Sequence, residues 1–283
     1  MLLDTGLFPA LLQALAAVST GGFASSPDSI AALEPAARGV VLALCGLGAV
    51  PLAVHHHAAR GRWGAAISDP QVVGLVVAGT LVTAWLVSHG GFADSSPAAR
   101  LGHGALTAFS AQTTAGFNTV APATLPPGSK LVLAGAMLVG GGTGSTAGGV
   151  KLLRLLVLLR LFAATLTRTA MPRQARSILR VAGRRLGDDE LRDILVLLAG
   201  FGSVVALSWW AFVTAGYPAV DAFFDVASAT STTGLSTGVT GPGLATHLKL
   251  VLIADMLLGR LEIVALLVLL APRSWLGRRM ETP

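Results

Sequence analysis

Three polar stretches of similar sequence interrupt an otherwise apolar chain. They read AAVSTGGFASS (residues 16–26), SAQTTAGFNTV (110–120) and SATSTTGLSTG (228–238). Each stretch combines hydroxyl side chains with a glycine, whose backbone can turn consecutive carbonyl groups to one side. Oxygens arranged in this way can replace the water shell of a metal cation, as rings of backbone carbonyls do in potassium filters. The three stretches are therefore candidate cation-coordinating turns.

The central residues of the three turns, STGG, TTAG and STTG, contain no carboxylate. Main-chain carbonyls would carry most of the coordination, while Thr and Ser hydroxyls would add oxygens and hold the turn. One such stretch alone would be interpreted as a polar loop that caps a helix, but three in equivalent places favour an ion site. The candidate ligands are Ser19, Thr20, Gly21 and Gly22; Thr113, Thr114, Ala115 and Gly116; and Ser231, Thr232, Thr233 and Gly234.

The composition indicates a membrane protein. Of the 283 residues, 53% are hydrophobic and only 12% are charged, with a mean hydropathy of +0.71, whereas soluble domains carry about 25% charged residues. Several apolar runs reach the roughly 20 residues that a helix needs to cross a bilayer. One of them is too long for a single crossing and is interrupted by GGGTGSTAGG. The expected spans are 37–58, 70–90, 128–165, 190–215 and 246–271.

A shorter semi-polar segment precedes each turn. Residues 7–18, 99–112 and 220–230 are expected to be helical, are too short to span a bilayer, and end at the turns. A segment that enters a membrane and returns is tolerated only where it is buried in protein or lines a water-filled path. The order of span, short helix, polar turn and span therefore indicates a repeated re-entrant unit.

The arginines predict the orientation of the chain. Arg60 and Arg62 follow the first span, an arginine cluster occupies residues 168–185, and further arginines lie in the tail after residue 271. By the positive-inside rule these parts are cytoplasmic, so the short helices enter from the outer side. The net charge of +6 then reflects membrane topology. Nucleic acid is not an expected partner, because the 168–185 loop has no interleaved aromatic side chains.

On its motifs the chain resembles the TrkH/KtrB/HKT superfamily of potassium transporters, and bacterial TrkH-type subunits in particular. The residues that carry the resemblance are the first two turns above, GGGTGSTAGGVKLLRLLVLLR (140–160) and MLLGRLEIVALLVLLAPRSW (256–275). The resemblance implies an all-α membrane protein built from span–pore-helix–filter–span repeats, four of which surround one pore with pseudo-fourfold symmetry. Residues 1–283 are expected to form one transport domain with a partial second repeat (1–68), a third (69–188) and a fourth (189–283).

The chain departs from the family pattern in three ways. It begins close to the second pore helix, so the first repeat and the outer helix of the second are expected to be missing. Ala115 stands where threonine is usual, and STTGLST (231–237) stands where the family usually has an Asn-Asn type of sequence. A filter built mainly from main-chain carbonyls is compatible with Ala115. The resemblance implies potassium uptake; the alternative is a non-conducting fragment or assembly partner of a split transporter.

The glycine-rich break in the third span is a second candidate site. Glycine costs about 1 kcal/mol relative to alanine inside a helix, so the helix should open here. GSTAGGVK is not a phosphate-binding loop, because its lysine is one place off the pattern and no Ser or Thr follows it. The resemblance implies a gate below the filter. Its candidate residues are Gly140, Gly141, Gly142, Thr143, Gly144, Ser145, Gly148, Gly149 and Lys151.

Arg260 lies deep within the last apolar run. A charge at this depth is costly and indicates a pore or a charged partner, and Asp255 and Glu262 on the same predicted helix are candidate partners. A buried ion pair is therefore one interpretation. The resemblance implies the other, an arginine that faces the pore beneath the filter and tunes ion passage.

The remaining polar residues point to no enzyme. No Ser/His/Asp set, HExxH motif or pair of carboxylates is expected at one membrane depth. Residues His55–His57 are adjacent on a predicted helix and point in different directions, so a metal site is disfavoured. The single cysteine, Cys45, excludes an intrachain disulfide. Asp221, near the start of the last short helix, suits the positive end of the helix dipole and is placed to attract cations at the outer mouth.

The resemblance also implies the surroundings of the protein. It predicts a multi-pass protein of the bacterial inner membrane, with K⁺ as the transported ion and no organic cofactor. The expected partners are membrane lipid, a second copy in a homodimer, and a cytosolic nucleotide-binding regulatory subunit of the TrkA type that docks on the basic loops. A separately encoded N-terminal repeat is a further expected partner.

Overall fold

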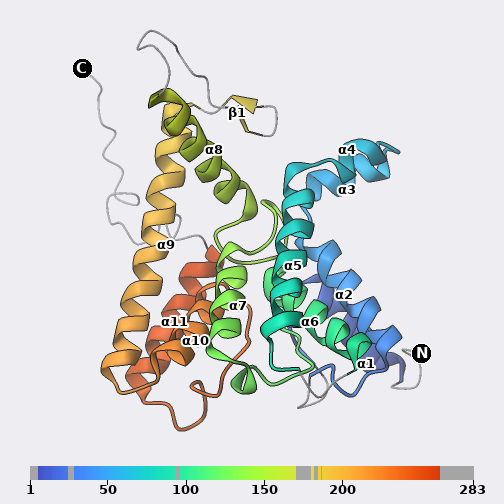
Figure 1. Ribbon diagram of the computed structural model, residues 1–283, viewed down its shortest axis with the longest axis vertical. Helices are drawn as coiled ribbons and strands as arrows, with labels where there is room; N and C mark the ends of the chain where they lie inside the picture. The colour runs from blue at the N-terminus through green and yellow to red at the C-terminus, as the bar shows by residue number, and fades with distance from the viewer. Residues whose placement is uncertain are drawn as a thin grey trace, which may run out of the picture.

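The structure is a computed structural model that describes residues 6–24, 29–92, 96–169, 180–181, 184–185 and 187–261. The regular secondary structure of the described residues is helical (Figure 1), apart from a two-residue antiparallel pair, β1 (Arg180–Val181) with β2 (Arg184–Arg185). The expected all-α class is confirmed.

The three short helices form within two residues of their expected bounds. They are α1 (Leu7–Val18), α6 (Pro97–Gln112) and α10 (Ala219–Thr230). Local signals start α6, because proline suits the first helical position and the Ser96 hydroxyl accepts a hydrogen bond from the amide of Ala99 at 3.3 Å. The left-handed turns described below end all three helices.

Within the described ranges, two helices are long and apolar enough to cross a bilayer by themselves, namely α5 (Pro70–His89) and α9 (Asp188–Thr214). The Asp69 carboxylate caps α5 by accepting a hydrogen bond from the amide of Gln71 at 2.8 Å. These helices confirm the expected spans at 70–90 and 190–215. Of the expected span at 246–271, α11 (Thr246–Leu261) is described, and its remaining residues lie outside the described part of the chain.

The apolar run expected as a span over 37–58 is bent, and its two halves together are apolar enough for one broken span or a re-entrant loop. The chain forms α2 (Pro35–Ala49) and α3 (Leu52–Ala59), which meet at an angle of 103°. The cause is Pro51, which has no amide hydrogen to continue the helix and which pushes Val50 into an extended conformation. The short helix α4 (Trp63–Ile67) follows.

The long apolar run at 128–165 is broken, as its glycines predicted. It forms α7 (Pro127–Val139) and α8 (Leu152–Thr169), and residues 140–151 between them are not helical. Gly140, Gly144 and Gly149 have φ angles of 70°, 72° and 76°, a backbone region that glycine adopts without steric cost. We call residues 140–151 the glycine-rich segment.

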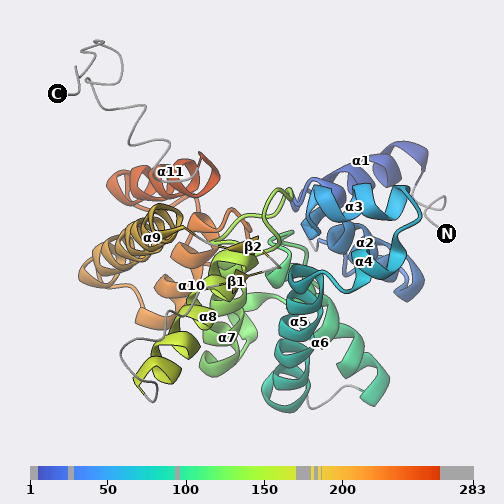
Figure 2. The ribbon, with the colours of Figure 1, turned by 90° about the horizontal axis from the view of Figure 1, so that it is seen from above.

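The helices form an arc around this segment. Contacts run in the order α1, α2, α6, α7, α10 and α11, while α5 packs on α6 and α9 packs on α10. Figure 2 shows the arc from above, with α1 and α11 at its two ends and the glycine-rich segment (yellow-green) near its centre. Small residues dominate the buried contacts of the short helices, including Ala17, Ala108, Ala111 and Ala227. Large apolar side chains such as Leu7, Leu81 and Trp210 remain exposed, which suits helices in contact with lipid.

Gly259 provides a test of how closely the last two helices approach. A β-carbon at Gly259 in α11 would overlap the backbone of Thr230 at the end of α10, whereas a β-carbon at Gly202 in α9 would have no neighbour within 4 Å. We expect Gly259→Ala to lower stability by about 1–3 kcal/mol, because a packed site must shift. Gly202→Ala should be neutral or stabilise the helix by up to about 1 kcal/mol. Thermal unfolding of the two purified variants in detergent checks this, and equal melting temperatures would contradict it.

Candidate functional site

The three polar turns end their helices with the same cap. In the first, the amide of Thr20 donates to the carbonyl of Ala17 at 3.1 Å and the amide of Gly21 donates to that of Ala16 at 2.8 Å. In the second turn the amides of residues 114 and 115 make the same two hydrogen bonds, at 3.1 and 2.9 Å. In the third turn the amides of residues 232 and 233 make them at 3.0 and 2.8 Å. This is the Schellman arrangement, in which the residue with positive φ is usually glycine. Here threonine occupies that position each time, with φ of 51°, 53° and 56° at Thr20, Thr114 and Thr232.

The glycine two residues after each threonine also has a positive φ, of 67°, 78° and 87° at Gly22, Gly116 and Gly234. A β-carbon on Gly22 would overlap the carbonyl oxygen of Ala115, and one on Gly116 would overlap that of Thr233. A β-carbon on Gly234 would have nothing within 4 Å. The first turn therefore abuts the second and the second abuts the third, while the third has a free edge. We call residues 19–22, 113–116 and 231–234, in this arrangement, the turn arc.

The three short helices direct their negative ends at the turn arc. The C-terminal end of a helix carries a partial negative charge from its unpartnered carbonyl groups. None of α1, α6 and α10 has a basic residue in its last turn to neutralise that charge. The site between the turns consequently favours a cation.

The glycine-rich segment packs against the ends of all three helices. The Thr146 hydroxyl lies 2.9 Å from both the Val18 and the Gly48 carbonyl oxygens. The amide of Gly148 donates to the Thr114 hydroxyl at 2.7 Å, and a β-carbon on Gly148 would overlap the carbonyl oxygen of Ser231. The segment thus touches the end of α1 and the second and third turns.

The hydroxyls of the strained threonines hold the glycine-rich segment in place. Thr20 donates to the Thr146 carbonyl at 2.9 Å, and Thr114 accepts from Gly148 as above. A non-glycine residue with positive φ costs of order 1–3 kcal/mol unless its surroundings enforce it. Glycine would suit the backbone better at positions 20 and 114, but it would remove these two bonds.

Arg260 reaches the same segment. Its guanidinium donates from Nη1 to the Thr146 carbonyl at 3.0 Å, and the Lys151 ammonium donates to the Ala147 carbonyl. Both side chains line a polar cavity of about 320 Å³ together with residues 144–149 and Gly259. Two cationic groups therefore border a cavity that the glycine-rich segment lines.

Asp255 is not the partner of Arg260 that the sequence offered. Its carboxylate accepts a hydrogen bond at 2.7 Å from the Ser208 hydroxyl of α9 and is buried. The other candidate, Glu262, lies outside the described residues. Asp221 is not a free carboxylate at the outer mouth either, because it forms an ion pair of 2.6 Å with Lys130 of α7. Its charge is balanced by that lysine.

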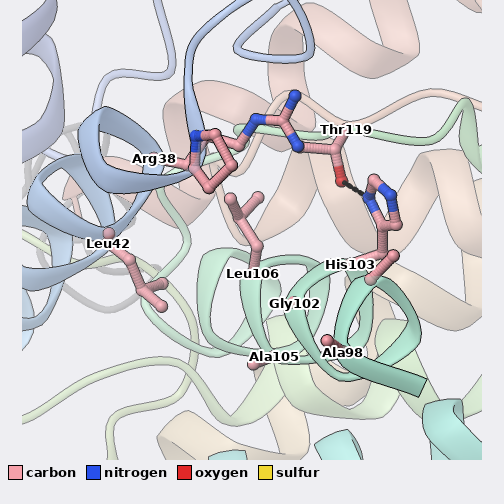
Figure 3. Close-up of a pocket in the computed structure, with 11 residues that line it drawn as sticks. Arg38, Leu42, Ala98, Gly102, His103, Ala105, Leu106 and Thr119 are labelled. Atoms are coloured by element: carbon pink, nitrogen blue, oxygen red, sulfur yellow. Dashed lines mark hydrogen bonds between the residues drawn. The ribbon is translucent and has the colours of Figure 1, made fainter. Parts of the chain in front are cut away.

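A second cavity lies away from the turns, between α2 and α6. It has a volume of about 440 Å³ and a mostly apolar lining that includes Leu42 and Leu106 (Figure 3). The His103 imidazole bonds the Thr119 hydroxyl at 2.8 Å at its edge, while Arg38 donates to the carbonyls of Ala31 and Leu33. In the described part of the chain, no group of three His, Cys, Asp or Glu residues could hold a metal ion.

Three residues with structural roles in the site were not among the sequence candidates. Thr146 contacts α1, α2 and Arg260. Its place in the motif GSTAGG was a signal that could have identified it. Gln112 is a buried amide at the end of α6 that donates to the Gly140 carbonyl at 2.7 Å. Asp225 lies on α10 and accepts hydrogen bonds from the segment after the third turn. An amide or carboxylate side chain on the semi-polar short helix that leads into a turn was the available signal for the last two.

Comparison with known proteins is consistent with this architecture. Residues 67–276 match the TrkH family model, described as a cation transport protein. An uncharacterized cation transporter of Methanocaldococcus jannaschii is 30% identical over 93% of this chain and 53% of its own length. The Trk system potassium uptake protein TrkI of Halomonas elongata is 30% identical over 94% of this chain and 56% of its own length.

A solved structure shows the same fold. The crystal structure of the potassium transporter TrkH from Vibrio parahaemolyticus superposes with a TM-score of 0.84 and 26% identity, over 96% of this chain and 60% of the other. The chain thus spans about half the length of these curated relatives. Because the family model covers most of the sequence, this membrane protein belongs to the TrkH family of cation transport proteins.

Proposed function

We propose that the chain contributes three quarters of a potassium-conducting pore, in which the turn arc is the selectivity filter. The observation that carries the proposal is the contact of each turn with the next through Gly22 and Gly116. In the proposed filter, main-chain oxygens of the three helix ends surround one space, and such oxygens replace the hydration shell of K⁺ in filters. The names of the relatives in Halomonas elongata and Vibrio parahaemolyticus support potassium as the ion.

The proposed ligands are those expected from the sequence. Carbonyls of residues 19–22, 113–116 and 231–234 coordinate the ion, and the helix ends stabilise its charge. The proposal assigns the chain to the bacterial inner membrane, with K⁺ as cargo rather than as a resident cofactor. A homodimer and a TrkA-type regulatory subunit stay predictions, because most of the basic loop expected to bind that subunit lies outside the described residues.

The glycine-rich segment is proposed as the gate. It lies directly against the turns and is held by hydrogen bonds from Thr20, Thr114 and Arg260. In the proposed mechanism this segment blocks passage between the turns that it contacts and the polar cavity that it lines, so ions pass only if it moves. Glycines at 140, 144 and 149 allow such movement because their backbone is not restricted by a side chain.

The alternative is a non-conducting fragment or an assembly partner of a split potassium transporter. The observation that favours it is Gly234, where a β-carbon would meet no described residue within 4 Å, so an ion in the arc would keep one side without protein oxygens. In the first candidate ions pass along the turn arc of this chain, completed by a further segment. In the second the chain carries no ion path of its own.

We expect the chain alone to give no potassium-selective uptake. A partly dehydrated cation with one open side loses part of its replacement shell, and charge in hydrocarbon costs several kcal/mol. Rubidium uptake should appear in uptake-deficient cells when the N-terminal part of a curated relative is supplied, fused or separate. The N-terminal part without this chain is the control. Potassium-selective flux from the purified chain in liposomes would contradict this and would require the arc to close across a subunit interface.

Gly116 tests the filter assignment. In the conducting form, Gly116→Ser should lower the K⁺/Na⁺ permeability ratio by about tenfold or more, because a side chain would displace the Thr233 carbonyl and disturb the ring. Gly102→Ser is the matched control, since a β-carbon at Gly102 in α6 would have no neighbour within 4 Å. Equal permeability ratios in the unaltered protein and Gly116→Ser would refute the assignment.

Arg260 tests the gate. Arg260→Ala removes a positive charge from the edge of the cavity and a bond to the glycine-rich segment, so uptake should rise by about threefold or more. Shortening residues 141–148 should act in the same direction. Lys249→Ala is the control, because this lysine is on the same helix but bonds the Pro242 carbonyl at 2.7 Å. If both gate variants show the uptake of the unaltered protein at equal membrane expression, neither Arg260 nor residues 141–148 lie in the ion path.

A further inference from the structure

Asp225 is a buried carboxylate behind the third turn. Its side chain points from α10 toward the chain that leaves the turn, and the residue is only 2% exposed. Its Oδ1 accepts from the amide of Thr237 at 2.7 Å and from the Thr237 hydroxyl at 2.9 Å. Its Oδ2 accepts from the Ser236 hydroxyl at 2.7 Å and from the amide of Thr240 at 3.0 Å. One carboxylate therefore holds three residues of a five-residue segment.

In these four contacts Asp225 acts as an acceptor through both of its oxygens. All four groups that approach Asp225 act as donors, and an ionised carboxylate is an acceptor through both oxygens. Hydrogen bonds to a charged acceptor are roughly twice as strong as those between neutral groups. Residues 236–240, which we call the exit strand although they form no β-strand, are consequently fixed to α10 rather than to a neighbouring repeat.

The second turn is supported differently. The chain that follows it is held by the neighbouring repeat, because the amide of Asn118 donates to the Ser29 hydroxyl at 3.2 Å and the Asn118 carbonyl accepts from the amide of Ile30 at 3.4 Å. The position equivalent to Asp225, nine residues before the turn glycine, is Thr107, whose hydroxyl is buried without a hydrogen-bond partner. The carboxylate thus occurs at the third turn, whose glycine has a free edge.

We propose that Asp225 is a positioning residue that fixes the third turn through the exit strand and thereby sets the cation selectivity of that turn. The proposal rests on the function proposed above. Asp225 does not touch the ion. It holds the segment that starts two residues after Gly234, at the end of the arc, where the second turn contacts Thr233 on one side and no described residue lies within 4 Å of a β-carbon at Gly234 on the other. The buried negative charge also favours a cation in front of the turn.

The test uses Asp225→Asn in the purified chain and in the conducting form. Asparagine keeps the shape but offers one acceptor oxygen, and its amide nitrogen would face two donors. Amide hydrogen exchange, followed by mass spectrometry, should become about tenfold faster at residues 236–240. The K⁺/Na⁺ permeability ratio should fall by about threefold or more. The K⁺/Na⁺ permeability ratio should fall less in Asp225→Glu, which keeps the charge and both acceptor oxygens, than in Asp225→Asn.

A matched control lies one turn earlier on α10. Asp221→Asn removes a carboxylate that binds Lys130 and leaves the exit strand bonded to Asp225, so it should lower stability without changing the permeability ratio. If Asp225→Asn is poorly expressed, Thr237→Val removes one of the four bonds and should give a smaller shift in the same direction.

The outcomes separate the two proposals. Unchanged exchange in the exit strand, or faster exchange with an unchanged permeability ratio, would overturn the role of Asp225 and leave the pore intact. Equal losses of selectivity in Asp221→Asn and Asp225→Asn would also overturn it, because the effect would then be one of general stability. Absence of selective uptake by the unaltered protein in every form would instead refute the proposed function, and with it the selectivity role of Asp225.

Discussion

The contact between neighbouring turns is the constraint on which the rest of the structure depends. Gly22 and Gly116 bring one backbone against the carbonyl of the next turn, and any side chain at either position would occupy that carbonyl's place. Helices that meet this closely at their ends must be narrow, and alanine fills much of the core around α6 and α10. They must also stop at one depth, which explains why the same Schellman cap ends all three. Short helices, small side chains and left-handed residues are consequences of one geometric requirement.

Threonine at the left-handed position connects the turns to the glycine-rich segment. The backbone there would favour glycine, and the hydroxyl is the feature that glycine lacks. Thr20 and Thr114 use it to bind Thr146 and Gly148. Thr146 in turn lies against α1 and α2 and accepts from Arg260. A movement of the segment must therefore break bonds to the first and second turns. The local strain of the threonines is balanced by bonds that exist only while the segment is docked, so the conformation of the turns and the position of the segment are linked energetically.

Much of this architecture follows from local sequence signals. The short helices, the turns and the break after α7 were predicted correctly, because apolar run length, Pro and Ser at helix starts, and clustered glycines act within a few residues. The bend between α2 and α3 was missed although Pro51 signalled it, since the apolar run continues on both sides. The hydrogen bonds of Thr146, and the ion pair of Lys130 with Asp221, join residues about 90 to 130 positions apart. No local pattern encodes such contacts. The ligand roles of the turn residues stay predictions.

The open edge of the arc changes what each turn requires. The second turn has a neighbouring turn on both sides, whereas the first and the third each have one, and the contacted carbonyls are those of Ala115 and Thr233. Beyond Gly234 the third turn meets no described residue within 4 Å. Its own helix also holds it from behind, through four hydrogen bonds to the buried carboxylate of Asp225. A segment that closes the arc would meet a turn that is already rigid. It would therefore lose less conformational entropy on docking than it would against a loose loop.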